Sequence, residues 1–238
     1  MKPSVCLLLD EAQKKMSGYA ALLNYRFINL SVKAQAGALL SVTVSAGGEA
    51  LPIERVALAR CPDGRDDRFE IYPMNRVLLN PLLAGLQQAH PEYTVELKDI
   101  SGTEDAEGKK DQYILATVPE VNDSRHSELK KAVETLSGRC DDLLKMTSAS
   151  YSDRIGLALE GVSPDDNAED KAEAKDALQD LLQRHQDLCK QFRAAKEKEI
   201  EDAYNHYKEK QNGQKSQADA SKASSNAGKQ MRWTANDE

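Results

Sequence analysis

Long hydrophobic runs are missing from this sequence. Its apolar stretches VCLLL (5–9) and VLLNPLLAGL (77–86) are far shorter than the roughly 20 residues that a membrane-spanning helix needs. The N-terminal segment also lacks a small-residue cleavage site before DEAQKKM, so it does not resemble a secretory signal. We therefore expect no membrane partner, and the sequence leaves an organellar presequence open.

Cysteine is scarce, and its spacing excludes the common cysteine-based sites. The cysteines are dozens of residues apart, with no C-x-x-C pair and no paired histidine spacing. Neither a zinc site nor a disulfide framework is therefore expected. We expect reduced and mostly buried thiols at Cys6, Cys61, Cys140 and Cys189.

Catalytic motifs are absent too. The chain has no G-x-x-x-x-G-K-[ST] loop or G-x-G-x-x-G turn for phosphate, and no H-E-x-x-H or G-x-S-x-G motif. The histidines are scattered, and we interpret His185, on an apolar helix face, as a core histidine with satisfied hydrogen bonds rather than a ligand. The sequence predicts no enzyme activity, no metal site and no cofactor.

An excess of positive charge is missing as well. The formal net charge is −7, which argues against a protein that coats nucleic acid by bulk electrostatics, so no DNA partner is expected. A local basic patch is still compatible with this balance. With 238 residues, 40% of them hydrophobic, the chain can form one large domain or two small ones.

What the sequence does contain is three long helical patterns. Each has apolar residues at steps of three and four, which is the narrow seam that a helix bundle buries. Before the third, GVSPDD (161–166) supplies a stop glycine, a candidate N-cap at Ser163, and Pro164 at the first helical position. The three seams are Leu9, Ala12, Met16, Tyr19, Leu23, Phe27 and Leu30; Leu129, Val133, Leu136, Cys140, Leu143, Thr147, Tyr151 and Ile155; and Leu178, Leu181, His185, Leu188, Phe192 and Ala195.

A segment of different character lies between the first and second patterns. It brings β-branched residues, a Gly47-Gly48 turn signal, and the strand-like alternation of DRFEIYPMN (67–75). A helix is predicted from near Asn75 to residue 90, with Pro81 in its first turn or at a kink. The stretches YTVELKDI and QYILATVP then predict the two strands of a hairpin.

The predicted fold class is therefore α+β, with two domains. Residues 1–33 and 120–210 form a long three-helix bundle, into which a β/α/β module of residues 34–119 is inserted. The two crossings, near Lys33 and Pro119, are expected side by side, where they would form a hinge. Residues 211–238 lack periodic apolar positions, and we predict a disordered or partner-ordered tail there.

In this architecture and in several strings, the chain resembles ribosome recycling factor over roughly residues 10–205. KAQAGALLSVTVSAGGEALPIERVA (33–57) is similar to the family's R-A-S-P-S-L-L-x-x-I-x-V-x-Y-Y-G-x-x-x-P-L-x-x-L-A stretch. Three further strings resemble the family's next strand and helix, its linker and helix start, and its K-E-K-E-[IL] signature. They are RFEIYPMNRVLLNPLLAGLQQA (68–89), VPEVNDSRHSELKKAVETL (118–136) and AAKEKEIED (194–202).

The resemblance implies a translation factor without an active site of its own. Its bundle would bind rRNA at the interface of the large ribosomal subunit, next to ribosomal proteins. Together with an elongation factor G-like GTPase, it would disassemble post-termination ribosomes while the inserted domain swings.

The chain departs from the family where that rRNA contact is made. The family patterns R-T-G-R and R-N-x-R-R-D-A-N-D-K are replaced by LSVK (30–33) and KMTSASYSDR (145–154), a turn rich in serine although hydroxyls compete for helix hydrogen bonds. Each lost phosphate contact lowers the salt slope of RNA affinity by about one unit. The remaining candidate rRNA-binding residues are Lys33, Arg125, Lys145 and Arg154, and the alternative for each is an ordinary solvated charge.

Three hypotheses for the function stay open. The first is a working recycling factor, and the second is a related ribosome assembly factor or resident (mito)ribosomal protein without splitting activity. The third is an unrelated helical adaptor protein. Ribosome association is the stronger prediction and recycling itself the narrower one. We expect a mitochondrial or other organellar location, with a bacterial cytoplasm as the alternative.

Overall fold

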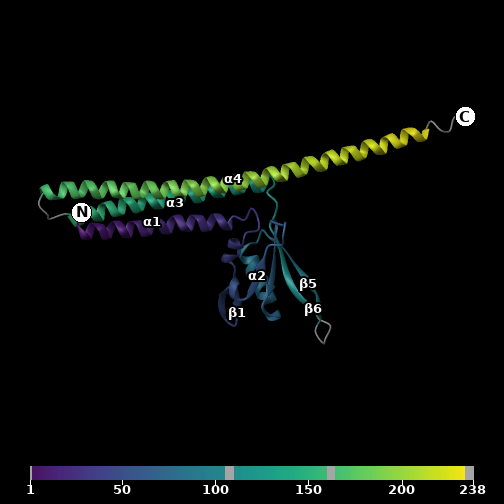
Figure 1. Cartoon of the computed structure of the whole chain (residues 1–238), viewed down its shortest axis with the longest axis horizontal. Helices are drawn as coiled ribbons and strands as arrows, with labels where there is room; N and C mark the ends of the chain where they lie inside the picture. The colour runs from purple at the N-terminus through teal and green to yellow at the C-terminus, as the bar shows by residue number, and fades with distance from the viewer. Residues whose placement is uncertain (1, 105–109, 160–163, 234–238) are drawn as a thin grey trace.

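Three long helices lie side by side, and a smaller module extends from one end of them (Figure 1). The computed structural model describes residues 2–104, 110–159 and 164–233, and for 104, 164–168 and 214–233 it describes the backbone alone. The helices are α1 (Pro3–Asn29), α3 (Asp123–Leu159) and α4 (Pro164–Trp233). The module follows α1 in the chain, so the predicted α+β fold, a three-helix bundle with an inserted module, is confirmed.

Most of the bundle core comes from the seams of α1 and α3, and α4 adds fewer buried residues. The predicted apolar positions of both helices face this core, except that Leu144 is fully buried and Leu143 only half-buried. Hydrophobic burial of this kind contributes about 25 cal/mol per Å² of apolar surface, which holds the three helices together. The buried residues are Val5, Leu9, Ala12, Met16, Ala20, Leu23 and Phe27 on α1, and Leu129, Val133, Cys140, Leu144, Thr147, Tyr151, Ile155 and Leu159 on α3.

The seam of α4 lies one residue later than predicted in its middle. Leu188 is 37% exposed and Ala195 is also exposed, whereas Cys189 and Lys196 are buried. A lysine can occupy such a position because its aliphatic stem packs against apolar neighbours while its ammonium group finds a partner. The prediction for Leu188 and Ala195 was therefore wrong.

His185 of α4 has the satisfied hydrogen bonds that were predicted. Its Nδ1 lies 2.8 Å from the carbonyl oxygen of Leu181, and its Nε2 lies 3.0 Å from the hydroxyl of Ser17. A carbonyl can only accept, so Nδ1 carries the proton and Nε2 accepts from Ser17. His185 therefore links α4 to α1 and is not a free ligand.

The ends of α4 concern two further predictions. The helix begins at Pro164, and its candidate N-cap, Ser163, lies outside the described residues. At the other end the helical backbone continues beyond the bundle as far as Trp233 (Figure 1). The predicted tail therefore begins inside α4, and whether a partner orders this part stays a prediction.

The module contains two antiparallel sheets and one helix. A four-stranded sheet has the order β3-β4-β6-β5, and β1 and β2 form a separate hairpin. The predicted hairpin of the two last strands is confirmed, because β5 pairs with β6 from Thr94 opposite Thr117 onward. The elements are η1 (Ala36–Ser41), β1 (Thr43–Ala46), β2 (Glu49–Pro52), η2 (Ile53–Arg55), β3 (Ala57–Arg60), β4 (Arg68–Pro73), η3 (Arg76–Leu78), α2 (Leu79–Ala89), β5 (Thr94–Glu104) and β6 (Lys110–Thr117).

Local sequence explains three features of the module. Gly47 and Gly48 both have positive φ, 61° and 86°, and form the two-residue turn between β1 and β2 that such a glycine pair favours. Pro81 lies in the first turn of α2, where its missing N–H costs no helical hydrogen bond. Gly85 lets α2 approach β1, since a Cβ there would lie 2.3 Å from the carbonyl oxygen of Thr43.

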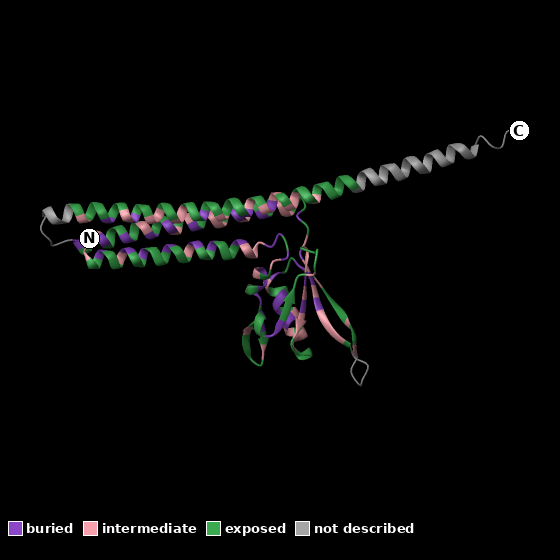
Figure 2. Ribbon diagram, viewed as in Figure 1, coloured by how far each residue is buried: buried purple, intermediate pink, exposed green. Residues whose placement is uncertain are grey.

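Two separate hydrophobic cores follow from this arrangement (Figure 2). One lies between the three bundle helices, and the other lies between the module's sheets, η1 and α2. Cys140 and Cys189 belong to the bundle core, but Cys6 and Cys61 are exposed, so the expectation of mostly buried thiols holds for only two of the four. Because the cores are separate, the contacts at the junction decide how the module sits on the bundle.

Candidate functional site

The hydroxyl-rich turn lies inside α3, which is helical without a break from Asp123 to Leu159. Thr147 and Tyr151 are buried toward the core, while Ser150 and Ser152 are exposed to solvent. The seam hydroxyls therefore pack in the bundle. Ser148 is half-buried and Ala149 is exposed, so the surface is uncharged at the two positions where the recycling-factor pattern has its next arginines.

Lys145 and Arg154 flank this turn, and each already has a carboxylate partner. Lys145 Nζ lies 2.6 Å from Asp141 Oδ2, and Arg154 Nη2 lies 3.1 Å from Glu11 Oε2. The hydrogen bond that Lys145 donates to Asp141 raises the pKa of Lys145 above its ordinary value, because it favours the charged ammonium group. The Arg154 guanidinium also lies over the ring of Tyr151, 4.6 Å from its centre. Both side chains are exposed, but the positive charge of each is balanced locally.

The structure does not bring Lys145 and Arg154 together. They are nine residues apart, and a helix turns by about 100° per residue, so they lie on opposite sides of α3. Asp141, the partner of Lys145, accepts a hydrogen bond from Gln186 of α4, whereas Arg154 reaches Glu11 of α1. A single RNA strand that lies along one side of α3 therefore cannot contact both Lys145 and Arg154.

Lys33 and Arg125 lie at the junction between bundle and module. Lys33 is exposed in the loop after α1, and Arg125 is half-buried in the first turn of α3. Arg125 Nη2 donates to the carbonyl oxygen of Ser31 at 2.6 Å, and burial lowers the pKa of Arg125. Arg125 therefore holds the segment that follows α1 in position. Sequence reasoning did not predict this positioning role.

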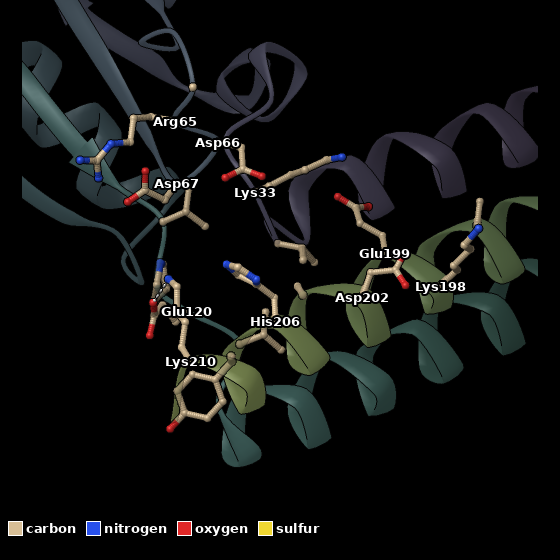
Figure 3. Close-up of a pocket in the computed structure, with 18 residues that line it drawn as sticks. Lys33, Arg65, Asp66, Asp67, Glu120, Lys198, Glu199, Asp202, His206 and Lys210 are labelled. Atoms are coloured by element: carbon tan, nitrogen blue, oxygen red, sulfur yellow. Dashed lines mark hydrogen bonds and ion pairs between the residues drawn. The ribbon is translucent and has the colours of Figure 1, made fainter. Parts of the chain in front are cut away.

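A cleft of about 660 Å³ separates the module from α4 at this junction. The crossings at Lys33 and Pro119 both line it, so the structure places them side by side as predicted. Figure 3 shows charged side chains of both signs around the cleft, and Lys210 of α4 bonds Glu120 across it at 2.8 Å. Its charged lining consists of Lys33, Arg65, Lys198 and Lys210, with Asp66, Asp67, Glu120, Glu199 and Asp202, and His206 beside them. Because its positive and negative side chains balance, the cleft does not favour the binding of a polyanion such as RNA.

A hydrogen-bonded chain joins α4 to the start of the module. Glu199 accepts from Gln35 Nε2 through Oε1 at 2.9 Å and from Lys196 Nζ through Oε2 at 3.0 Å. Lys196 is only 6% exposed, and burial lowers its pKa although Glu199 acts in the opposite direction. Glu199 thus compensates a buried ammonium group and holds the module through Gln35.

A second connection runs from the module to the end of α1. The Tyr93 hydroxyl donates to Ser31 Oγ at 2.5 Å, and both residues are buried. Burial raises the pKa of Tyr93 to about 12, because the phenolate would lose its hydration. The carbonyl oxygen of Ser31 also accepts the hydrogen bond from Arg125, so α1, α3 and the module meet at Ser31.

Sequence reasoning missed most of this junction. Gln35, Tyr93 and Ser31 carry no local pattern, and their contacts span 164 and 62 residues of chain. The available signal was the string AAKEKEIED (194–202), which contains Lys196 and Glu199. Within the ranges that the structure describes, there is no group of three or more metal-ligating side chains and no helix apolar enough to span a membrane.

Comparison with solved structures identifies the fold. The solution structure of a ribosome recycling factor superposes with a TM-score of 0.64 and 19% sequence identity, covering 85% of this chain and 100% of that chain. A weaker match, with a TM-score of 0.49, 16% identity, and coverage of 82% and 98%, comes from models of the T. thermophilus ribosome recycling factor and E. coli elongation factor G bound to the E. coli post-termination complex. No protein-family model and no curated protein matches the sequence. The chain therefore has the fold of ribosome recycling factor at low sequence identity.

Proposed function

We propose that this chain is a ribosome-associated factor of the recycling-factor type, which binds the interface of the large ribosomal subunit. The observation that carries the proposal is the match to the entire chain of a ribosome recycling factor, bundle and inserted module together. A long bundle with a module at its side suits a protein that fits between two large bodies. Binding energy and a moving domain would then do the work, without an active site.

The finer proposal is that the factor promotes disassembly of post-termination ribosomes together with an elongation factor G-like GTPase. Its support is the order of the recycling-factor strings along the sequence and the junction cleft, where a module could change its angle. A splitting assay with elongation factor G and GTP tests this directly. Release of subunits that depends on this protein is expected, and no release at saturating protein would reject recycling while leaving ribosome binding open.

A second candidate is a ribosome assembly factor or resident ribosomal protein without splitting activity. The pairing of Lys145 with Asp141 and of Arg154 with Glu11 favours it, because charges already balanced give little gain on binding a phosphate. A protein surface, unlike rRNA, does not need free cations on this side of the bundle. Binding to the large subunit without splitting is the outcome that this candidate predicts.

The role of the predicted cations is tested by co-sedimentation with large subunits. The triple variant Lys33→Ala, Lys145→Ala and Arg154→Ala should bind more weakly at moderate salt and should show a flatter salt dependence. A matched control is Lys190→Ala, since Lys190 is an exposed α4 lysine that also pairs with an aspartate. Unchanged binding of the triple variant would remove these residues from the rRNA surface and favour a protein partner.

A further inference from the structure

Two cysteines face each other inside the bundle, and the function proposed above does not use them. Cys140 of α3 and Cys189 of α4 are 5% and 9% exposed, and their sulfur atoms are 3.6 Å apart. The other two cysteines, Cys6 and Cys61, are exposed. The pair therefore forms a distinct site that joins the second and third helices of the bundle.

The hydrogen bonds around the pair give the two thiols different roles. Cys140 Sγ lies 3.6 Å from the carbonyl oxygen of Tyr19 on α1, which can only accept, so the Cys140 thiol donates there and Cys189 donates to Cys140. The bond from Cys189 lowers the pKa of Cys140, and the same interaction, with burial, raises the pKa of Cys189. Cys140 is thus the better nucleophile of the two, and Cys189 is the neighbouring resolving thiol.

We propose that Cys140 and Cys189 form a reversible disulfide between α3 and α4 when the protein meets a small peroxide. A disulfide has a sulfur–sulfur distance of about 2.05 Å, so the pair needs to approach by about 1.5 Å. Rotation about the side-chain bonds of two neighbouring core residues can supply much of this change. The oxidant has to be small, because both thiols are buried.

The reaction proceeds in two balanced steps. The Cys140 thiolate attacks one oxygen of hydrogen peroxide, the O–O bond breaks, and the products are a Cys140 sulfenic acid and hydroxide, which becomes water with the proton that Cys140 gave up. The sulfur of Cys189 then attacks the sulfur of Cys140, and the hydroxyl group leaves as water with the Cys189 proton. Two thiols are oxidised, one peroxide is reduced, and two waters form.

The disulfide would close a loop of the chain that includes the connection between α3 and α4. The two cysteines are 49 residues apart, so the bond would remove much conformational freedom from the unfolded chain. The bundle would become more stable without any change in the surface that it presents. This inference does not depend on the proposed function, because it rests on the core of the bundle alone.

The test is peroxide treatment of the full chain, followed by blocking of free thiols in denaturant and peptide mapping by mass spectrometry. We expect a Cys140–Cys189 link within one chain and a melting temperature higher by roughly 5–10 °C, both reversed by dithiothreitol. Recovery of both cysteines as blocked thiols, while Cys6 and Cys61 are oxidised, would overturn the proposal. So would an oxidised protein that melts at or below the temperature of the reduced one.

Two variants make the test specific. Cys6→Ser with Cys61→Ser removes the exposed thiols and should leave the link and the gain in melting temperature unchanged. Cys189→Ser should abolish both, with helical circular dichroism as a check that the variant folds. If Cys189→Ser does not fold, the wild-type comparison between oxidised and reduced protein still decides the matter.

Discussion

Replacing Tyr93 by Phe tests the connection between module and bundle most sharply. The change removes the hydrogen bond to Ser31 and keeps the ring, which stacks on His90 and Phe69 with centre distances of 4.5 Å and 6.1 Å. A lost hydrogen bond between buried groups costs about 1 kcal/mol of unfolding free energy, and more when the remaining partner is left unsatisfied. We therefore expect Tyr93→Phe to lower the stability by about 1–2 kcal/mol near pH 8.

The pH dependence makes this prediction specific. In the unfolded chain Tyr93 has its ordinary pKa near 10, and in the folded protein its pKa is about 12. Below pH 10 both states keep the proton, so this stabilising contribution is fully present. As the pH rises from 10 to 12, the unfolded state loses the proton first, and stability falls by about 1.4 kcal/mol for each pH unit. Near pH 11 the wild type should thus have lost about 1.4 kcal/mol that Tyr93→Phe does not lose.

The assay is urea unfolding of both proteins, followed by far-UV circular dichroism near pH 8 and near pH 11. All other tyrosines and lysines titrate equally in both proteins, so the difference between them isolates Tyr93. The advantage of the wild type should shrink to about zero at the higher pH. Tyr113→Phe is a matched control, because Tyr113 is a half-buried tyrosine of β6 that stacks on Tyr72. A difference between wild type and Tyr93→Phe that stays constant with pH would refute the reasoning.

Three further predictions concern other parts of the molecule. Glu11→Gln removes the carboxylate that competes for Arg154, so binding to large subunits should tighten and its salt slope should steepen by up to about one unit, and unchanged binding would count against a contact of Arg154 with phosphate. Gly85→Ala forces a Cβ against the β1 backbone and should destabilise the module by about 1–3 kcal/mol in urea unfolding. The control Gly138→Ala places its Cβ in open space on α3 and should stabilise the protein by about 0.5–1 kcal/mol. Equal effects of the two substitutions would contradict the tight packing of α2. Gln35→Ala breaks a hydrogen bond between the module and α4, so the distances between spin labels on the two domains should become more widely distributed. An unchanged distribution would show that this hydrogen bond does not restrain the module.

Much of the fold could be predicted because its signals are local. The apolar seam of α1 and the Gly47-Gly48 turn follow from helical spacing and from backbone freedom, which depend on few neighbouring residues. The seam of α4 was misplaced at Ala195 because periodicity treats the neighbouring lysine as polar. Lys196 is nevertheless buried, since Glu199 compensates its charge. Such compensation is visible only when both side chains are placed in space.

The candidate site was harder to predict for the same reason. Lys145 and Arg154 were grouped because they flank one turn, yet nine residues of helix set them on opposite sides of α3. Their carboxylate partners, Asp141 and Glu11, show the difference between a neighbour in sequence and one in space. Asp141 is four residues away and could have been anticipated, whereas Glu11 lies on another helix. The assignment of Arg125 to rRNA stays a prediction, and the structure adds a contact that the sequence does not indicate, the hydrogen bond from its guanidinium to the Ser31 carbonyl oxygen.

Binding to the large ribosomal subunit is the central claim, and sedimentation through a sucrose cushion tests it directly. Purified protein is mixed with separated large and small subunits from bacterial and from mitochondrial ribosomes, and the pellets are analysed at low and moderate salt. The account predicts saturable recovery with a large subunit, close to one copy each, and none with the small subunit. Protein that stays in the supernatant with every subunit would contradict the account and leave a helical adaptor protein as the better description.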